Sequence, residues 1–268
     1  MSGTPHLRPL FPRSVREVAT ALENLYKDYA HHNINDPMDE LLFIICSTKT
    51  SEPSYLASFR ALKIAFPTGS SLVGVPAENI ARVIAKGGLS TTKSKAIKAL
   101  VDEISSRFSS MTLEPLRGMT DRQVEKLLTS LPGIGKKTAR CVMMYSLGRQ
   151  VFPVDTHCWR IALRLGWVRK TKKDGHCSPG DMDRLQSRIP PELRFSLHVN
   201  FISLGRNICT ARNPKCSTCP IEGLCKKMGV KSSTDHLVEL SVTGSSENRI
   251  AQCRAVHLKG TAEKREFC

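Results

Sequence analysis

The sequence of 268 residues has no apolar run that approaches the ~18 residues needed for a membrane-spanning helix. Its first residues, MSGTPHLRPLFPRSVREV, lack the apolar core of a secretory signal. No segment combines a cationic amphipathic face with exposed Trp or Phe, the pattern of helices that lie on anionic membranes. We therefore expect no membrane partner.

No stretch alternates apolar and polar residues over the length of a strand, and no internal repeat is present. Apolar residues recur instead at helical spacing. This pattern predicts an all-α fold, with helices over about residues 15–32, 36–50, 54–66, 76–88, 91–108, 120–130, 136–148, 156–168, 181–189 and 191–208. Periodicity is lost from about residue 231 onward, so we expect residues 231–268 to form a mostly disordered tail.

Acidic residues are too few to balance the basic ones, and the formal net charge is +16. Residues 226–268 carry eight Lys or Arg and five Asp or Glu, so most of the excess lies in the preceding, ordered part. A folded body this basic favours a polyanionic partner. Basic residues near residue 210 could hold backbone phosphates, or could form an ordinary solvated face: Arg206, Arg212, Lys215, Lys226 and Lys227.

Four of the ten cysteines lie close together with the spacing C-x6-C-x2-C-x5-C: Cys209, Cys216, Cys219 and Cys225. A four-cysteine zinc site usually has two C-x2-C pairs, whereas this run has one. The spacing favours a [4Fe-4S] cluster, and structural zinc is the alternative. The other six read as reduced thiols in a reducing compartment, a prokaryotic cytoplasm or a nucleus: Cys46, Cys141, Cys158, Cys177, Cys253 and Cys268.

The segment LPGIGKKTAR, residues 131–140, separates two predicted helices. Gly133 and Gly135 lack a Cβ, so the backbone N–H groups of a tight hairpin could approach a phosphate closely. The following helix would point its N-terminus at the same place. The hairpin is therefore a candidate phosphate clamp that reads no base sequence, and an ordinary helix–helix turn is the alternative.

Lys137 stands in the first turn of that second helix, and Asp155 follows eighteen residues later in VFPVDTHCWR. A lysine can act as a nucleophile only after it loses its proton, and partial burial beside a helix N-terminus is expected to favour that loss. A carboxylate nearby could stabilise positive charge on a sugar. The pair suits attack on C1′ of a deoxynucleotide. Taken singly, Lys137 reads as a solvated or phosphate-binding lysine and Asp155 as a helix N-cap.

LPGIGKKTA, VDTH and the cysteine run, in this order and spacing, resemble the endonuclease III family of helix–hairpin–helix DNA glycosylases. The resemblance covers about residues 15 to 230. It implies that Lys137 is the Schiff-base lysine, that Asp155 is the catalytic aspartate and that the four cysteines bind a [4Fe-4S] cluster. It also implies two helical domains with the active site in their cleft. One is a helical barrel over residues 34–150, and the other, the cluster domain, joins residues 1–33 to 151–230.

The chain departs from the family pattern at two places that would touch DNA. Lys49 stands where the family has a glutamine that fills the space left by the extruded base. Leu89 matches an intercalating leucine, but two extra residues precede the next helix. FPVDTHCWRIALRLGWV also resembles the plant 5-methylcytosine glycosylases. The predicted DNA-binding set is completed by Gly133, Gly135, Lys136, Thr138 and His157.

The leading interpretation is a monomeric base excision repair glycosylase with AP lyase activity, acting on double-stranded DNA that contains a damaged, mispaired or modified pyrimidine. Base extrusion is expected, because C1′ cannot be reached inside a stacked duplex. A monofunctional glycosylase is one alternative, although such relatives commonly lack the hairpin lysine. A non-catalytic DNA-binding protein with a redox cluster is the other, although it would need neither Lys137 nor Asp155.

Overall fold

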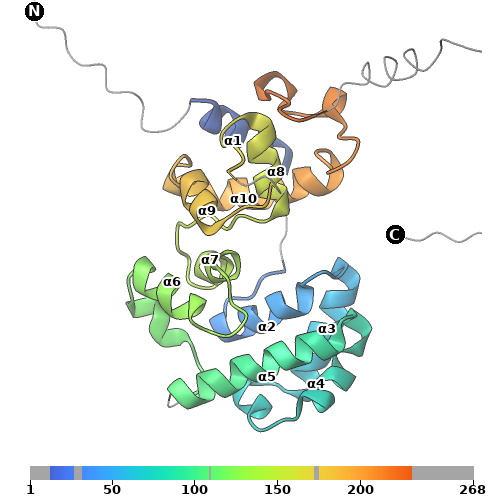
Figure 1. Cartoon of the computed structure of the whole chain (residues 1–268), viewed down its shortest axis with the longest axis vertical. Helices are drawn as coiled ribbons and strands as arrows, with labels where there is room; N and C mark the ends of the chain where they lie inside the picture. The colour runs from blue at the N-terminus through green and yellow to red at the C-terminus, as the bar shows by residue number, and fades with distance from the viewer. Residues whose placement is uncertain (1–12, 27–31, 109, 172–174, 231–268) are drawn as a thin grey trace, which may run out of the picture. The chain divides into compact units, whose positions relative to one another are not determined.

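The computed structural model describes residues 13–26, 32–108, 110–171 and 175–230. Within these ranges the fold is all-helical, without a strand, as predicted, and none of the described helices is long and apolar enough to cross a membrane. The contacts divide the chain into Met1–Gly229 and Val230–Cys268, and the helices of the described ranges all lie in the first unit (Figure 1). The expected tail, with Cys253 and Cys268, and residues 1–12 lie outside the described ranges.

The helices follow the predicted segments closely. Their bounds are α1 Arg13–Tyr26, α2 Pro37–Ser47, α3 Glu52–Ala65, α4 Ala77–Val83, α5 Ser90–Arg107, α6 Asp121–Thr129, α7 Lys136–Tyr145, α8 Thr156–Leu165, α9 Pro179–Gln186 and α10 Arg194–Asn207. Short 3-10 turns join them at Gly69–Leu72, Ala85–Gly87, Glu114–Gly118, Pro191–Leu193, Cys216–Thr218 and Glu222–Leu224.

Side-chain caps fix where several helices begin. The carboxylate of Asp36 accepts from the Asp39 backbone N–H at the start of α2, where proline occupies the first helical position. Thr120 and Gln123 form a reciprocal capping box at the start of α6. Because these signals are local, the sequence alone predicts where α2 and α6 begin. The hairpin follows directly after α6.

The first of two hydrophobic core clusters is built by α2 to α7, in one continuous stretch of chain from Met38 to Val151. Its centre is fully buried and includes Leu41, Leu62 and Ile97. Helix α2 is central, and it packs against α3, α5 and α7 (Figure 1). This cluster supports the helix that carries Lys137.

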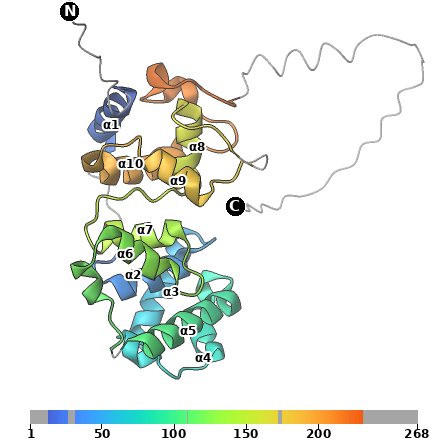
Figure 2. The same ribbon diagram turned by 60° about the vertical axis from the view of Figure 1, so that its left-hand side comes forward.

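The second cluster joins the two ends of the described chain. It combines α1, from Val15 to Leu22, with residues from Phe152 to Ile221 in α8, α9, α10 and the cysteine loop. Figure 2 shows α1 beside α10 and the cysteine loop, and α1 packs against both α10 and the Glu222–Leu224 turn. The change of cluster between Val151 and Phe152 lies beside the predicted boundary at residue 150. The contacts keep Met1–Gly229 in one compact unit, and the division into two domains stays a proposal.

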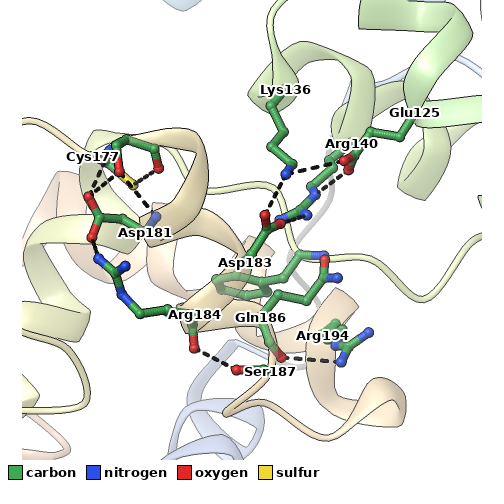
Figure 3. A network of polar contacts seen from close by, with 12 residues as sticks. Glu125, Lys136, Arg140, Cys177, Asp181, Asp183, Arg184, Gln186, Ser187 and Arg194 are labelled. Atoms are coloured by element: carbon green, nitrogen blue, oxygen red, sulfur yellow. Dashed lines mark hydrogen bonds and ion pairs between the residues drawn. The ribbon is translucent and has the colours of Figure 1, made fainter. Parts of the chain in front are cut away.

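A polar network joins α6 and α7 to α9 (Figure 3). Arg140, with a side chain only 3% exposed, donates from Nε to Glu125 Oε2 at 2.7 Å and from Nη2 to Asp183 Oδ1. Lys136 Nζ lies 2.7 Å from Asp183 Oδ2 and 3.3 Å from Glu125 Oε1. The network therefore fixes the first turn of α7 to the second cluster.

Candidate functional site

The predicted hairpin lies between α6 and α7. Gly133 has a φ of 73°, in the left-handed region that favours glycine, and Gly135 precedes the first turn of α7. A Cβ at either glycine would meet no atom within 4 Å, and both residues are exposed. The flanking Leu131 and Ile134 are buried and fix the turn to the core. The hairpin thus presents open backbone at a helix N-terminus, the geometry of an anion site.

Lys137 lies in the first turn of α7 and is partly buried. The pKa of its amine is raised above the ordinary value, because its interaction with Cys141, and then those with Asp155 and Glu40, outweigh the opposing effect of burial. Burial does lower this pKa, as expected, but its effect is outweighed, so the expectation of a lowered pKa was wrong. It considered the desolvation of the amine and omitted the three acidic groups that face it. Lys137 is therefore an ammonium in the free protein.

Asp155 is the N-cap of α8, and its Oδ1 accepts from the Cys158 backbone N–H at 2.7 Å. Burial alone would raise its pKa. The pKa is nevertheless lowered by His198, by the Cys158 N–H, and by His157 and Lys137. Asp155 is therefore a carboxylate, held both by a cap hydrogen bond and by positive charge. The structure brings it within electrostatic reach of Lys137 from a different helix.

Two buried acidic groups next to Lys137 were not predicted. Cys141 lies one helical turn beyond it and forms a side-chain hydrogen bond with it, and burial raises the pKa of the Cys141 thiol to about 11. Glu40, fully buried on α2, has its pKa raised to about 7 by desolvation. The i, i+4 spacing from Lys137 to Cys141 could have found the first. A lone acid in the apolar run DELLFIIC could have pointed to the second.

The remaining predicted DNA contacts lie on α7 and α8 and in the turns beside α2 and α5. The side chains of Lys49 and Leu89 are exposed, in turns that follow α2 and precede α5. Thr138 and His157 are partly buried, and burial lowers the pKa of His157. The ammonium of Lys136 already pairs with Glu125 and Asp183. Direct contact of these side chains with DNA stays a prediction.

The four cysteines of the loop carry free thiols, and all are partly buried. Burial, followed by the three neighbouring sulfurs, raises the pKa of Cys219. Arg164 on α8 donates from Nη1 to Cys209 Sγ at 3.1 Å. Across the described ranges, no three His, Cys, Asp or Glu side chains lie close enough together to hold a single metal ion. The donor set itself, four thiols of one loop, fits an iron–sulfur cluster.

Comparisons with known proteins agree with this geometry. The family described as "HhH-GPD superfamily base excision DNA repair protein" matches residues 43–178, and the "Iron-sulfur binding domain of endonuclease III" matches residues 209–225. Endonuclease III of Bacillus subtilis is 33% identical over 168 residues, covering 62% of this chain and 70% of that protein. DEMETER-like protein 2 of Arabidopsis thaliana is 31% identical over 160 residues, 55% of this chain.

The chain spans only part of some relatives. The match covers 12% of DEMETER-like protein 2 and 57% of another Arabidopsis relative. Among solved structures, a trapped endonuclease III–DNA covalent intermediate superimposes with a TM-score of 0.68 and 24% identity, covering 82% of this chain and 97% of that one. This likeness shows the same fold.

Proposed function

The chain belongs to the HhH-GPD superfamily of base excision DNA repair proteins, within its endonuclease III family, and carries that family's iron–sulfur domain. From this premise we propose that it is a bifunctional DNA glycosylase that removes a damaged, mispaired or modified pyrimidine and then cleaves the strand. The observation that carries the proposal is the pair formed by Lys137 and Asp155, an ammonium and a carboxylate brought together from α7 and α8.

Base removal would begin with stretching of the glycosidic bond, which leaves positive charge on the sugar and negative charge on the base. The carboxylate of Asp155 stabilises the developing positive charge, as preorganised groups do in a site with little water. The departing base takes a proton from the Lys137 ammonium. The amine produced by this transfer is the nucleophile, and it forms a bond with C1′. The raised pKa of Lys137 thus keeps the proton in place until the leaving group needs it.

Strand cleavage would follow from the same covalent bond. The C1′–O4′ bond of the adduct then breaks, and O4′ takes one proton from the lysine nitrogen. This leaves a protonated Schiff base between Lys137 and C1′, which makes the C2′ hydrogen acidic. In this proposal the Asp155 carboxylate accepts that proton. The electron pair then expels the 3′ phosphate, and water later releases the lysine. A glycosylase that used water as its nucleophile would not need an amine at Lys137.

Access to C1′ requires that the target nucleotide leave the duplex. Leu89, 53% exposed, offers an apolar wedge, and the hairpin glycines offer N–H groups to the backbone phosphates. Lys49 can donate to guanine O6 or N7 on the opposite strand. We therefore propose pyrimidine-derived substrates with guanine opposite.

The cluster would be held by Cys209, Cys216, Cys219 and Cys225, and when bound it supplies four iron–thiolate bonds that close the loop. Arg164 and Arg160 join this loop to α8. Arg164 donates to Cys209 Sγ, and Arg160 Nε donates to the Cys209 carbonyl at 2.9 Å. Because Asp155 caps the same helix, the loop would hold the carboxylate in place.

Borohydride trapping on a panel of duplexes tests this function. The panel contains thymine glycol, uracil, thymine opposite guanine, 5-methylcytosine and 8-oxoguanine. We expect covalent trapping and strand cleavage with at least one pyrimidine. Lys137→Ala should abolish both reactions, a loss of at least about 1,000-fold, while binding to DNA persists.

Trapping by Lys137→Ala at the wild-type level would overturn the assignment of Lys137 as the nucleophile. Processing of 8-oxoguanine alone would overturn the substrate class and leave the lysine chemistry standing. Lys49→Gln should reduce the preference for guanine opposite more than it slows base release. Lys95→Gln, an exposed lysine on α5, is the control for loss of one surface charge.

A further inference from the structure

Lys49 and Leu89 share an uncommon backbone conformation. Each has a φ of 51°, and within the described ranges the only other non-glycine residues with positive φ are Asn213 and Lys227. The left-handed conformation costs a lysine or a leucine about 1 kcal/mol or more. Both side chains are nevertheless exposed, and no packing of their own side chains accounts for the strain. The surrounding structure must hold the two turns in place.

A single buried lysine holds both turns. Lys93, in α5, is 4% exposed, and its Nζ donates to the Cys46 carbonyl at 2.7 Å and to the Gly87 carbonyl at 3.0 Å. Its third hydrogen bond goes to the Thr50 hydroxyl. Cys46 and Thr50 flank the turn of Lys49, and Gly87 lies two residues before Leu89. One ammonium therefore bridges the two turns.

Two further contacts make the bridge rigid. The Thr50 hydroxyl lies 2.9 Å from the Gly87 carbonyl and can donate to it, which links the turns a second time. Gly87 in turn sits directly on α3, since a Cβ there would lie 2.3 Å from Ser58 Oγ. The turn of Leu89 is therefore packed closely against α3, and the turn of Lys49 is tied to it.

A buried ammonium contributes less to the stability of a fold than an apolar side chain of similar volume would. Burial lowers the pKa of Lys93, because desolvation disfavours its charged form. An apolar side chain of similar volume would avoid that cost. What an apolar side chain could not do is hold two carbonyl groups and a hydroxyl from separate turns at fixed positions. The geometry of Lys93 is therefore better explained by the turns that it positions.

We infer that Lys93 is a positioning residue that fixes the spacing between Lys49 and Leu89, so that the two side chains enter DNA as one two-pronged wedge. This inference rests on the proposed function, because it assigns both side chains to the DNA-opening step. It adds that neither turn acts independently. Lys93 itself touches no DNA, and it acts through the Cys46 and Gly87 carbonyls.

Lys93→Met, which keeps the length and removes the charge, tests the inference. We expect single-turnover excision from duplex DNA to slow by roughly tenfold to a hundredfold, since small displacements of positioning groups cost that much. Cleavage of a preformed abasic site, which has no stacked base to extrude, should change by less than about threefold. Lys98→Met is the matched control, because Lys98 lies in the same helix but faces solvent and pairs with Asp102.

The energetic coupling between Lys49 and Leu89 distinguishes a positioning role of Lys93 from a general role in folding. In the wild-type background, the rate effects of Lys49→Ala and Leu89→Ala should be non-additive, and in Lys93→Met they should become additive. Equal slowing of both reactions by Lys93→Met, or coupling that persists without Lys93, would overturn the inference. Thr50→Val, which removes only the hydroxyl link, should show the same partial uncoupling if Lys93→Met does not fold.

Failure of the proposed function would look different. If the wild type excised no base, 2-aminopurine placed beside the target would still report opening of the stack in the complex with Lys137→Ala. A fluorescence rise that is lost when Lys93→Met is added would support the two-pronged wedge without any chemistry. A rise that is unaffected by Lys93→Met would sink it.

Discussion

The two hydrophobic clusters contribute opposite members of the candidate catalytic pair. The first, built by α2 to α7 from one continuous stretch of chain, carries Lys137 at the start of α7. The second carries Asp155 at the start of α8 and joins α1 to residues more than a hundred positions away. One half of the site is supported by local packing, and the other by a closure between distant segments.

The two regions also differ in how polar groups stabilise them. In the first, the ionisable side chains of Lys93 and Glu40 are buried and form hydrogen bonds with residues of the nearby turns. In the second, Arg160 and Arg164 reach from α8 to carbonyl groups of the cysteine loop, including those of Cys209 and Thr210. The second region therefore depends on a loop whose own apolar content is small. From this difference we expect the structure of the lysine half to depend less on the cluster than that of the aspartate half does.

The largest effect should come from breaking the second region alone. Cys219→Ser removes one of four thiolates, and we expect loss of iron and of the broad absorbance near ~400 nm that accompanies a cubane. Amide exchange should become fast in α8 and α10 while α3 and α5 keep most of their protection. Cys177→Ser, on a partly buried thiol outside the loop, is the control. Uniform loss of amide protection in both regions would contradict the expected difference between them. Stoichiometric zinc without iron would contradict the iron–sulfur cluster in the second region.

Asp155→Asn tests the chemistry of the second region while its fold is kept. Asparagine is as good an N-cap as aspartate, so α8 should keep its stability, but the negative charge beside Lys137 is lost. We expect single-turnover base removal to fall on the order of 100- to 1,000-fold, with little change in affinity for DNA. Asp155→Ala should show the same rate loss plus about 1 kcal/mol of destabilisation from the lost cap. An unchanged rate in Asp155→Asn would exclude the carboxylate from catalysis.

The sequence predicted those structural features that depend only on residues close together in the chain. The hairpin glycines, the N-cap role of Asp155 and the cysteine loop all follow from short motifs, and the structure places the first two as expected. The start of α7 at Lys136 was predicted from the end of the hairpin. These features were accessible because turn and cap chemistry acts over three or four residues.

The rest depends on segments that meet only in the folded chain. Lys93 reads as one solvated lysine among several in TTKSKAIKAL, and its burial is visible only once the Cys46 and Gly87 carbonyls surround it. The direction of the Lys137 pKa was mispredicted in part for the same reason: the largest influence, Cys141, lies one turn along the same helix and was overlooked, whereas Asp155 and Glu40 reach Lys137 from other helices. Charge pairing across helices has no signal in a single sequence.

A smaller effect should follow from cutting the link between the regions. Asp183 on α9 pairs with Lys136 and with the buried Arg140, and Asp183→Asn would leave Arg140 with Glu125 alone. Because the Asp183 side chain is 52% exposed, we expect a loss of about 1 to 2 kcal/mol in the free energy of unfolding, below that of a fully buried pair.

Asp102→Asn is a matched control for this change, since Asp102 is equally exposed, at 52%, and pairs with Lys98 within one helix. It should cost less than about 0.5 kcal/mol. Chemical denaturation of both variants measures the difference. If Asp183→Asn costs no more than Asp102→Asn, the network in Figure 3 does not stabilise the junction between the clusters.

The smallest effect concerns the pH dependence of the first region. Desolvation raises the pKa of Glu40 to about 7, against hydrogen bonds from the Ile34 N–H at 2.8 Å and the Asn33 side chain at 2.5 Å. A carboxyl whose folded pKa is raised binds its proton more tightly in the folded state than in the unfolded one. Its stabilising contribution is therefore complete below its unfolded pKa of 4.5 and is lost as pH rises through about 7.

Glu40→Gln should remove this titration from the first region and leave the second unchanged. Between roughly pH 6 and 8, the wild type should lose about 1 kcal/mol more unfolding free energy than Glu40→Gln, as the linkage relation requires. Glu78→Gln, on the exposed side of α4, controls for the loss of one carboxyl and should follow the wild-type profile. Denaturant midpoints measured across that range give the difference directly. Parallel profiles for wild type and Glu40→Gln would mean that Glu40 ionises well below pH 6. The ionisation of Glu40 beside Lys137 would then not lower the unfolding free energy of the first region in this pH range.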